Sequence, residues 1–427
     1  MANAAITNSG RAARPGPDAR DGTNGGASRR IVVYGATGTA GRLIASLLQD
    51  HGTTLVLAGR DRGRLEEVAQ ALETGESTVE VCPAPVHDPA GLRRAMDGAD
   101  IVIACAGPFA RMGEPVMRAA IACGVHYLDI AIEQSFLRHT YESCESLARK
   151  AGVVVVSGLG CLVGLGDIAA HLAAQTLAEV DQPGKLDEVT VAYAFERLSS
   201  GHDHQGDDHT MTTRPGQGLR RSLIDSASQP ALLWSHDRWD TTALAGEHLT
   251  CNFGDELGEQ PAIAFPLGDV ITLPRHLSAA RIQTYIALAG LGPLGPWLAR
   301  ASRFFGPVVS LALRSPWAVQ ARPWLDEWLA GSSLAIGAAA DLFVPTEPRV
   351  VVTAVVRRGF LGQRVLLTAD DPYHTSAALV AWAAARLLSA DHIPPGVRAP
   401  GEIFAPRAAL DALAEQGHIQ FATSAPG

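Results

Sequence analysis

The sequence predicts an α/β fold built on a doubly wound parallel sheet, followed by a second unit of different pattern. From residue 31 to about 180, short apolar runs alternate with longer amphipathic segments. A glycine-rich turn follows the first of these runs. Buried apolar strands that alternate with helices are typical of a parallel sheet covered on both faces. The chain has 427 residues, which is enough for two domains.

The strands of the first unit are expected where apolar residues run without interruption, at 31–34, 54–58, 79–82, 101–105, 127–130 and 153–156. The helices are expected between and after them, from the glycine turn to about 49, at 62–72, and near 90–96, 114–123, 135–150 and 166–178. In the second helix, Leu65, Val68 and Leu72 recur at helical spacing and form one apolar face.

The pattern changes after about residue 180. Further strands are expected at 188–195, 350–356 and 365–368, and a last apolar helix at 375–388. Residues 199–220 are rich in Gly, His, Asp, Thr and Pro, which predicts a long loop. The apolar, Trp-rich stretch 282–325 has three interpretations: a pair of core helices, a substrate tunnel or dimer face, or a contact with a membrane surface.

The composition excludes several classes of protein. Hydrophobic residues make up 47% of the chain, so it is not disordered throughout. The net charge of −9 argues against a dedicated nucleic-acid binder. The six cysteines lack CxxC and zinc spacing, so we expect reduced thiols, no metal centre and a cytoplasmic location. Residues 1–29 lack the apolar core of a signal peptide and are expected to be a disordered leader, and no helix is expected to span a membrane.

The strongest motif is the turn between the first strand and the first helix. It reads Gly35, Ala36, Thr37, Gly38, Thr39, Ala40 and Gly41. Glycines allow the tight turn, the close approach of a pyrophosphate and the packing of helix on strand, while the helix N-terminus offers unpaired N–H groups to an anion. Because the motif lies between a strand and a helix, we expect these seven residues to bind a dinucleotide.

The end of the second strand predicts which nicotinamide cofactor is used. NAD sites place an acidic residue there to bind the ribose 2′-hydroxyl. This chain has Arg60 instead, with two further arginines close by. A guanidinium suits the 2′-phosphate of NADP, which makes NADPH the expected cofactor. The alternative is an ordinary solvated helix start that Asp61 caps.

A second cofactor-binding segment is expected at the end of the fourth strand, at Ala106, Gly107 and Pro108. In an open α/β sheet this edge faces the cofactor crevice, so these residues can shape the backbone beneath the nicotinamide ribose. A simple turn that ends the strand is the alternative.

The candidate catalytic residues are Tyr127, His202 and Asp129. The Tyr-x-x-x-Lys proton relay of short-chain dehydrogenases is absent from the sequence. Because a reduced double bond also takes up a proton, Tyr127 in the fifth strand and His202 in the long loop are candidate donors. A core tyrosine and a solvated loop histidine are the alternatives. Asp129, with Glu133, is expected to position the substrate or the nicotinamide ribose, or else to cap the next helix.

Five segments of the chain form a series: YGATGTAGR at 34–42, AGR at 58–60, AGPFARMGE at 106–114, HYLD at 126–129 and DDPYHTSA at 370–377. Taken together, they resemble the saccharopine-dehydrogenase-like oxidoreductases, a group that includes the trans-acting enoyl reductases of lipid and polyketide assembly. The resemblance implies a nucleotide domain that a substrate domain interrupts. The expected fold class is therefore α/β, a doubly wound Rossmann-type parallel sheet with an inserted α+β substrate domain.

This reading divides the chain into a leader (1–29), a dinucleotide-binding domain (30–165 and 366–427) and a substrate and dimerisation domain (166–365). The expected function is an NADPH-dependent reductase that transfers hydride to an enoyl-type C=C bond of a largely apolar small molecule, in lipid or secondary-metabolite biosynthesis. An imine or carbonyl reductase of saccharopine type and a nucleotide-binding scaffold without catalysis are the alternatives. We also expect a homodimer, with a weak membrane-surface contact as a further option.

Overall fold

A computed structural model of the chain describes residues 29–49, 53–72, 77–197, 217–227, 229–242, 247–287, 348–390 and 393–425. Nearly all of the predicted leader, His202 with the loop around it, and most of the apolar stretch 282–325 lie outside these residues.

The first sheet is parallel throughout the described residues and has seven strands in the order β15-β6-β5-β4-β1-β2-β3. Its strands form because short runs such as IVIA in β4 are buried along their whole length. The strand order reverses beside β1, which opens a crevice at the carboxyl ends of β1 and β4. The bounds are β1 (Arg29–Tyr34), β2 (Thr53–Gly59), β3 (Thr78–Pro83), β4 (Ile101–Ala104), β5 (His126–Asp129), β6 (Val154–Val156) and β15 (Gly396–Arg398).

Helices follow these strands, and short-range signals define their ends. The Asp88 side chain accepts a hydrogen bond from Ala90 N–H and so begins the third helix, in which Pro89 is the first residue. Gly124 and Gly152 end the fourth and fifth helices in the left-handed conformation, with φ of 72° and 70°. The bounds are α1 (Thr39–Leu47), α2 (Arg62–Leu72), α3 (Pro89–Met96), α4 (Phe109–Cys123) and α5 (Gln134–Ala151).

The second sheet is mostly antiparallel, with order β10-β11-β12-β7-β13-β14-β16 and a β8–β9 hairpin paired to β12. The pair formed by β12 and β7 is parallel. The strands are β7 (Leu186–Arg197), β8 (Ala231–Ser235), β9 (Arg238–Thr242), β10 (His248–Asn252), β11 (Glu259–Ala264), β12 (Ala279–Ala287), β13 (Pro348–Arg358), β14 (Leu361–Ala369) and β16 (Gln420–Ser424).

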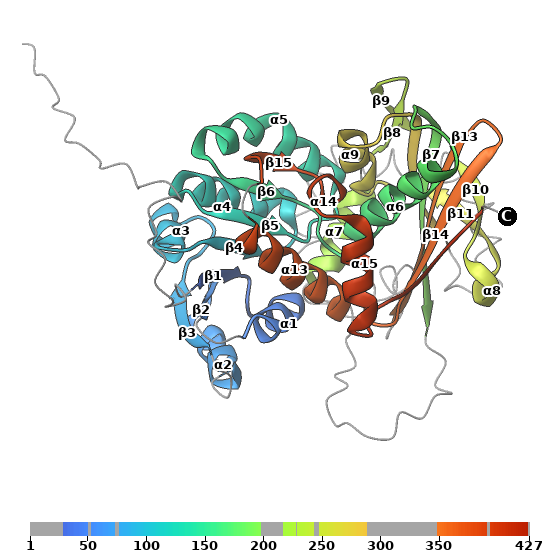
Figure 1. The fold of residues 1–427 in the computed structure, drawn as a ribbon. Helices are drawn as coiled ribbons and strands as arrows, with labels where there is room; N and C mark the ends of the chain where they lie inside the picture. The colour runs from blue at the N-terminus through green and yellow to red at the C-terminus, as the bar shows by residue number, and fades with distance from the viewer. Residues whose placement is uncertain are drawn as a thin grey trace, which may run out of the picture.

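The two sheets lie side by side, and helices α6 (Gly164–Val180) and α13 (Pro372–Ser389) connect them (Figure 1). Helix α6 packs on β13 and β14, while α13 contacts α1 and strands of both sheets. The remaining helices are α7 (Gln217–Ala227), α8 (Gly254–Leu257), α9 (Asp269–Thr272), the 3-10 helix η2 (Leu273–Arg275), α14 (Pro400–Ile403) and α15 (Pro406–Glu415).

This architecture confirms the predicted doubly wound parallel sheet and the second, mixed unit. Segment 366–427, predicted to return to the first domain, supplies β15 to the first sheet but β16 to the second, where it pairs with β14. Segment 199–220, predicted as a loop, overlaps the first turn of α7. Among the described helices, none combines the length and the hydropathy needed to cross a bilayer.

Candidate active site

The glycine turn leaves room for a bound phosphate because two of its positions admit no side chain. Gly35 directly follows β1 and has φ of 85°, and a Cβ there would lie 2.8 Å from the Ala106 nitrogen. A Cβ on Gly41 would collide with the Gly35 carbonyl oxygen. The backbone of α1 can therefore lie directly against β1, which is the cradle that a pyrophosphate requires.

The N-terminus of α1 completes this cradle. Gly38 is the N-cap residue and provides no side-chain acceptor for the first turn. The N–H of Gly38 itself donates to the Gly35 carbonyl over 3.0 Å, which closes the turn. Because the first N–H groups of a helix have no partner within it, those of α1 are available to an anion.

A cavity of about 570 Å³ begins at this turn and runs along the carboxyl ends of the parallel strands. Most of the residues predicted to bind the cofactor line it, namely Gly35, Thr37, Gly38, Thr39, Ala40, Arg60, Ala106 and Gly107. Ala36 is fully buried, and Ala36, Gly41 and Pro108 lie behind the lining. The structure thus brings the three predicted cofactor segments to one cavity.

One end of the cavity is basic. Arg60 follows the last residue of β2, and both Arg60 and Arg64 line the cavity beside His87. The Asp61 side chain accepts a hydrogen bond from Arg64 N–H over 3.2 Å, so it caps α2 as the alternative interpretation expects. Because Arg60 and Arg64 both line this end of the cavity, they are the candidates to contact a 2′-phosphate.

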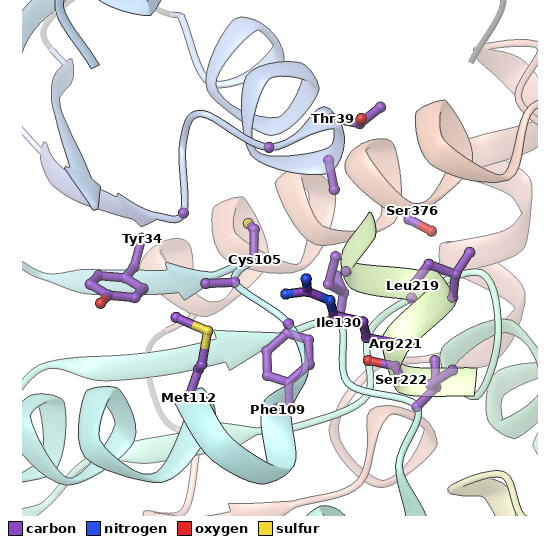
Figure 2. Close-up of a pocket in the computed structure, with 18 of the residues that line it drawn as sticks. Tyr34, Thr39, Cys105, Phe109, Met112, Ile130, Leu219, Arg221, Ser222 and Ser376 are labelled. Carbon is purple, nitrogen blue, oxygen red and sulfur yellow. The ribbon is translucent and has the colours of Figure 1, made fainter. Parts of the chain in front are cut away.

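The opposite end of the cavity is apolar. Figure 2 shows Phe109 and Leu219 on facing sides of it, with Ile130 between them. Ile132, Leu162 and Phe195 add to this lining. Two cysteines also lie here, Cys105 and Cys161, and burial raises the pKa of both thiols, so neither is a ready nucleophile. This end suits a largely apolar ligand.

Glu133 is a buried residue that connects the elements around the apolar end of the cavity through hydrogen bonds. Its side chain is fully buried and accepts hydrogen bonds from Phe109 N–H (2.9 Å), Ile132 N–H (3.1 Å) and the Ser222 hydroxyl (2.6 Å). Glu133 therefore holds the start of α4 and the helix α7 against the carboxyl ends of β4 and β5. In this way it shapes the cavity through its neighbours, without lining it.

The candidate catalytic residues Asp129 and Tyr127 are fully buried at the end of β5 and do not line the cavity. Asp129 accepts hydrogen bonds from Ala131 N–H (2.9 Å), Gly158 N–H (2.8 Å) and the Ser157 hydroxyl (2.6 Å). Burial outweighs these bonds and raises the pKa of Asp129 to about 6. Burial also raises the pKa of Tyr127. Their placement gives no support to direct contact with a substrate, and His202 lies outside the described residues.

A second buried polar cluster joins α6 to β7, α9 and α14. Asp167 in the first turn of α6 accepts hydrogen bonds from Gly401 N–H (2.6 Å) and faces the His276 imidazole at 3.0 Å. Burial alone would raise the pKa of Asp167, but His276 and these hydrogen bonds hold it below its usual value. The hydroxyl of Tyr193 donates to Asp269 (2.6 Å) and accepts from Val163 N–H (3.0 Å). These contacts fix the segment that ends in the cavity residues Cys161 and Leu162.

Among the described residues, no cluster of His, Cys, Asp or Glu has the arrangement of a metal site. The sequence reasoning did not find Arg221 and Ser222 of α7 or Tyr373 of α13, all of which line the cavity. Arg221 and Ser222 directly follow the segment 199–220 that was predicted to be a loop, and no local sequence pattern marks them as part of a site.

The comparisons with known proteins agree with this geometry. Residues 31–156 match the family described as saccharopine dehydrogenase NADP binding domain. A trans-acting enoyl reductase of Mycobacterium ulcerans is 31% identical over 175 residues, which cover 40% of this chain and 42% of the relative. A lipid droplet localized protein of Caenorhabditis elegans is 32% identical over 138 residues, which cover 30% of this chain and 32% of the relative. The chain thus matches less than half the length of these relatives.

The whole fold has a counterpart among solved structures. Saccharopine dehydrogenase (L-Glu forming) from Saccharomyces cerevisiae superposes with a TM-score of 0.59 at 14% identity, covering 93% of this chain and 100% of that chain. The likeness confirms the predicted two-unit architecture. The family match over residues 31–156 confirms the expected cofactor, NADP(H). Over residues 31–156 the chain is therefore similar to the NADP-binding domain of the saccharopine dehydrogenase family.

Proposed function

We propose that this protein is an NADPH-dependent reductase that delivers hydride to an enoyl-type C=C bond of a largely apolar small molecule. The observation that carries the proposal is that one cavity is lined by the glycine turn, by arginines at one end and by apolar side chains at the other end. The name of the enoyl reductase relative supports the same type of reaction. A role in lipid or secondary-metabolite biosynthesis follows from the apolar substrate and is part of the proposal.

The residues present fit NADPH. Gly35 and Gly41 leave the space that the pyrophosphate needs, the N-terminus of α1 supplies N–H donors, and Arg60 with Arg64 can hold the 2′-phosphate. The bound nicotinamide would supply the hydride, since the protein provides position and polarity while the cofactor carries the redox chemistry.

The apolar end would bind the reducible part of the substrate and exclude water from it. Phe109, Ile130 and Leu219 offer contact surface to a hydrocarbon chain. Product formation also requires a proton. Tyr373 lines the cavity at the start of α13 and is only partly buried, which makes it a better placed candidate donor than the fully buried Tyr127.

The test uses probes that share one alkyl chain and differ in the reducible bond. The purified protein is incubated with NADPH deuterated at C4 and with trans-2-dodecenoyl N-acetylcysteamine thioester, dodecanal or the imine formed from dodecanal and glycine. We expect NADPH oxidation at 340 nm with the thioester, and deuterium at its β carbon by mass spectrometry.

Reduction of dodecanal or the imine without reduction of the thioester would replace the proposal by the carbonyl or imine alternative. NADPH binding without oxidation in any arm would favour the non-catalytic scaffold. The Gly41→Ala variant is the negative control for NADPH oxidation, because its added methyl group would close the phosphate cradle and prevent NADPH binding.

A further inference from the structure

Arg221 is a cation directed into the apolar end of the cavity. It lies on α7, is partly buried and lines the cavity. Figure 2 shows its guanidinium group turned toward the interior, between Ile130 and the strand end that carries Cys105. The side chain therefore reaches the part of the cavity where the reducible bond would lie.

Within the described residues, no carboxylate pairs with this guanidinium group. The Glu133 carboxylate accepts hydrogen bonds from the neighbouring Ser222 hydroxyl, Phe109 N–H and Ile132 N–H, and forms no ion pair with Arg221. A cation held in an apolar cavity without a counter-charge is unfavourable, since it loses water and gains no partner. Such a group is poised to bind a negatively charged or strongly polar oxygen of a ligand.

The position of Arg221 is set by contacts on both sides of it in the chain. The Ser222 hydroxyl is fixed to Glu133 at 2.6 Å. A Cβ on Gly107 would lie 3.4 Å from the Ser222 oxygen and 3.7 Å from Gly218 Cα, so α7 packs across the carboxyl end of β4. That strand end is the crevice in which open α/β sheets bind the reactive part of their ligand.

We propose that Arg221 is a catalytic residue that hydrogen-bonds the carbonyl oxygen conjugated to the substrate's C=C bond, an inference that rests on the proposed function. Bound NADPH would supply the hydride for the new C–H bond at the β carbon, and the π electrons of the C=C bond would then shift and leave negative charge on the carbonyl oxygen. Arg221 stabilises that oxygen. Uptake of a proton at the α carbon then restores the carbonyl and completes the two-electron reduction of the substrate.

This role makes a prediction about binding that does not depend on turnover. A carboxylate carries negative oxygen where the charge develops, whereas the amide of the same chain is neutral. We therefore expect the NADP⁺-loaded protein to bind dodecanoate more tightly than dodecanamide by calorimetry. Arg221→Ala should weaken dodecanoate about tenfold or more and dodecanamide by a clearly smaller factor, since both ligands lose a hydrogen bond but only the anion also loses an ion pair.

The variants separate Arg221 from the cofactor site. Arg221→Lys should keep part of the dodecanoate affinity, because it keeps the charge but not the fork of donors. Arg118→Ala is the control, since Arg118 pairs with Glu114 on the outer face of α4. NADPH affinity, measured by fluorescence, should be the same in all of these proteins. With the dodecenoyl thioester, Arg221→Ala should lower kcat by about 10²–10³.

If Arg221→Ala loses as much affinity for NADPH as for dodecanoate, the guanidinium group binds the cofactor's phosphates, and the proposal is overturned. Unchanged dodecanoate affinity in Arg221→Ala, with the same unfolding temperature as the parent protein, would also overturn the proposal. If the parent reduces no enoyl probe, the proposed function fails, and with it the catalytic role of Arg221. If the parent reduces the probe but Arg221→Ala keeps the parent's kcat, the role of Arg221 alone fails.

Discussion

Arg60→Ala should separate the affinities for NADPH and NADH. Arg60 lines the basic end of the cavity, where the structure offers no acidic side chain to a ribose 2′-hydroxyl among the lining residues. The variant removes hydrogen bonds from a charged donor to the 2′-phosphate, each of which contributes about 1.5–3 kcal/mol. Because Arg60 is solvent-exposed, the lower limit applies, and 1.4 kcal/mol corresponds to a factor of ten in affinity. NADPH should therefore bind about tenfold more weakly, and NADH, which lacks the phosphate, should bind as before.

Arg64 and Arg62 supply the internal comparison. Arg64 lines the same end of the cavity, so the Arg60→Ala/Arg64→Ala double variant should weaken NADPH by roughly 100-fold if both groups contact the phosphate. Arg62 does not line the cavity and pairs with Glu66 at 3.5 Å, so Arg62→Ala should leave both cofactors unchanged. Fluorescence titration of the three proteins measures the dissociation constants. Equal losses for NADPH and NADH in Arg60→Ala, or an Arg62→Ala effect as large as that of Arg60→Ala, would show that Arg60 does not bind the 2′-phosphate.

Four further predictions concern the site and its support. Gly41→Ala should lower the free energy of unfolding by about 1–3 kcal/mol through overpacking and should abolish NADPH binding. Gly38→Ala, whose Cβ would lie 3.4 Å from the nearest backbone oxygen, should have smaller effects on both quantities. Equal losses of stability and of NADPH affinity in the two variants would count against the phosphate cradle. Tyr193→Phe leaves Asp269 and Val163 N–H without their shared partner, so urea denaturation should show a loss of about 1–3 kcal/mol, and an unchanged midpoint would contradict this. Burial raises the pKa of Asp269 to about 8, so its contribution to stability is complete below its unfolded pKa near 4 and is lost as the pH rises through 8. The urea midpoint of Asp269→Asn should therefore rise relative to that of the parent protein between pH 5 and 8. A constant difference between the two midpoints over this range would contradict the prediction. Tyr373→Phe should lower turnover by about 10²–10⁴ at saturating NADPH while Tyr127→Phe stays within a few-fold, and the reverse order would return the donor role to Tyr127.

The parts of the site that the sequence predicts are local. The glycine turn and Arg60 each follow directly from a strand end, so pattern and spacing place them at the same edge of the sheet. The carboxyl end of β4 with Ala106 and Gly107 follows in the same way. In each case the chemistry depends on a few neighbouring residues and on the parallel order of the strands.

The apolar end depends on contacts between residues far apart in the chain, which the sequence does not reveal. Glu133 and Ser222 meet across 89 positions, and this hydrogen bond determines where Arg221 lies. Tyr127 ends in the core because side chains alternate between the two faces of a strand, and both faces of β5 are covered by helices. A tyrosine near a strand end therefore met one condition of a proton donor without reaching the cavity.

The most direct test is a structure of the protein with NADP⁺ bound. The proposed binding mode places the pyrophosphate on the turn of residues 35–41, the 2′-phosphate against Arg60 and Arg64, and nicotinamide C4 next to Phe109, Ile130 and Leu219. A dinucleotide bound with its nicotinamide at the arginine end, or with the 2′-phosphate out of reach of both arginines, would contradict it.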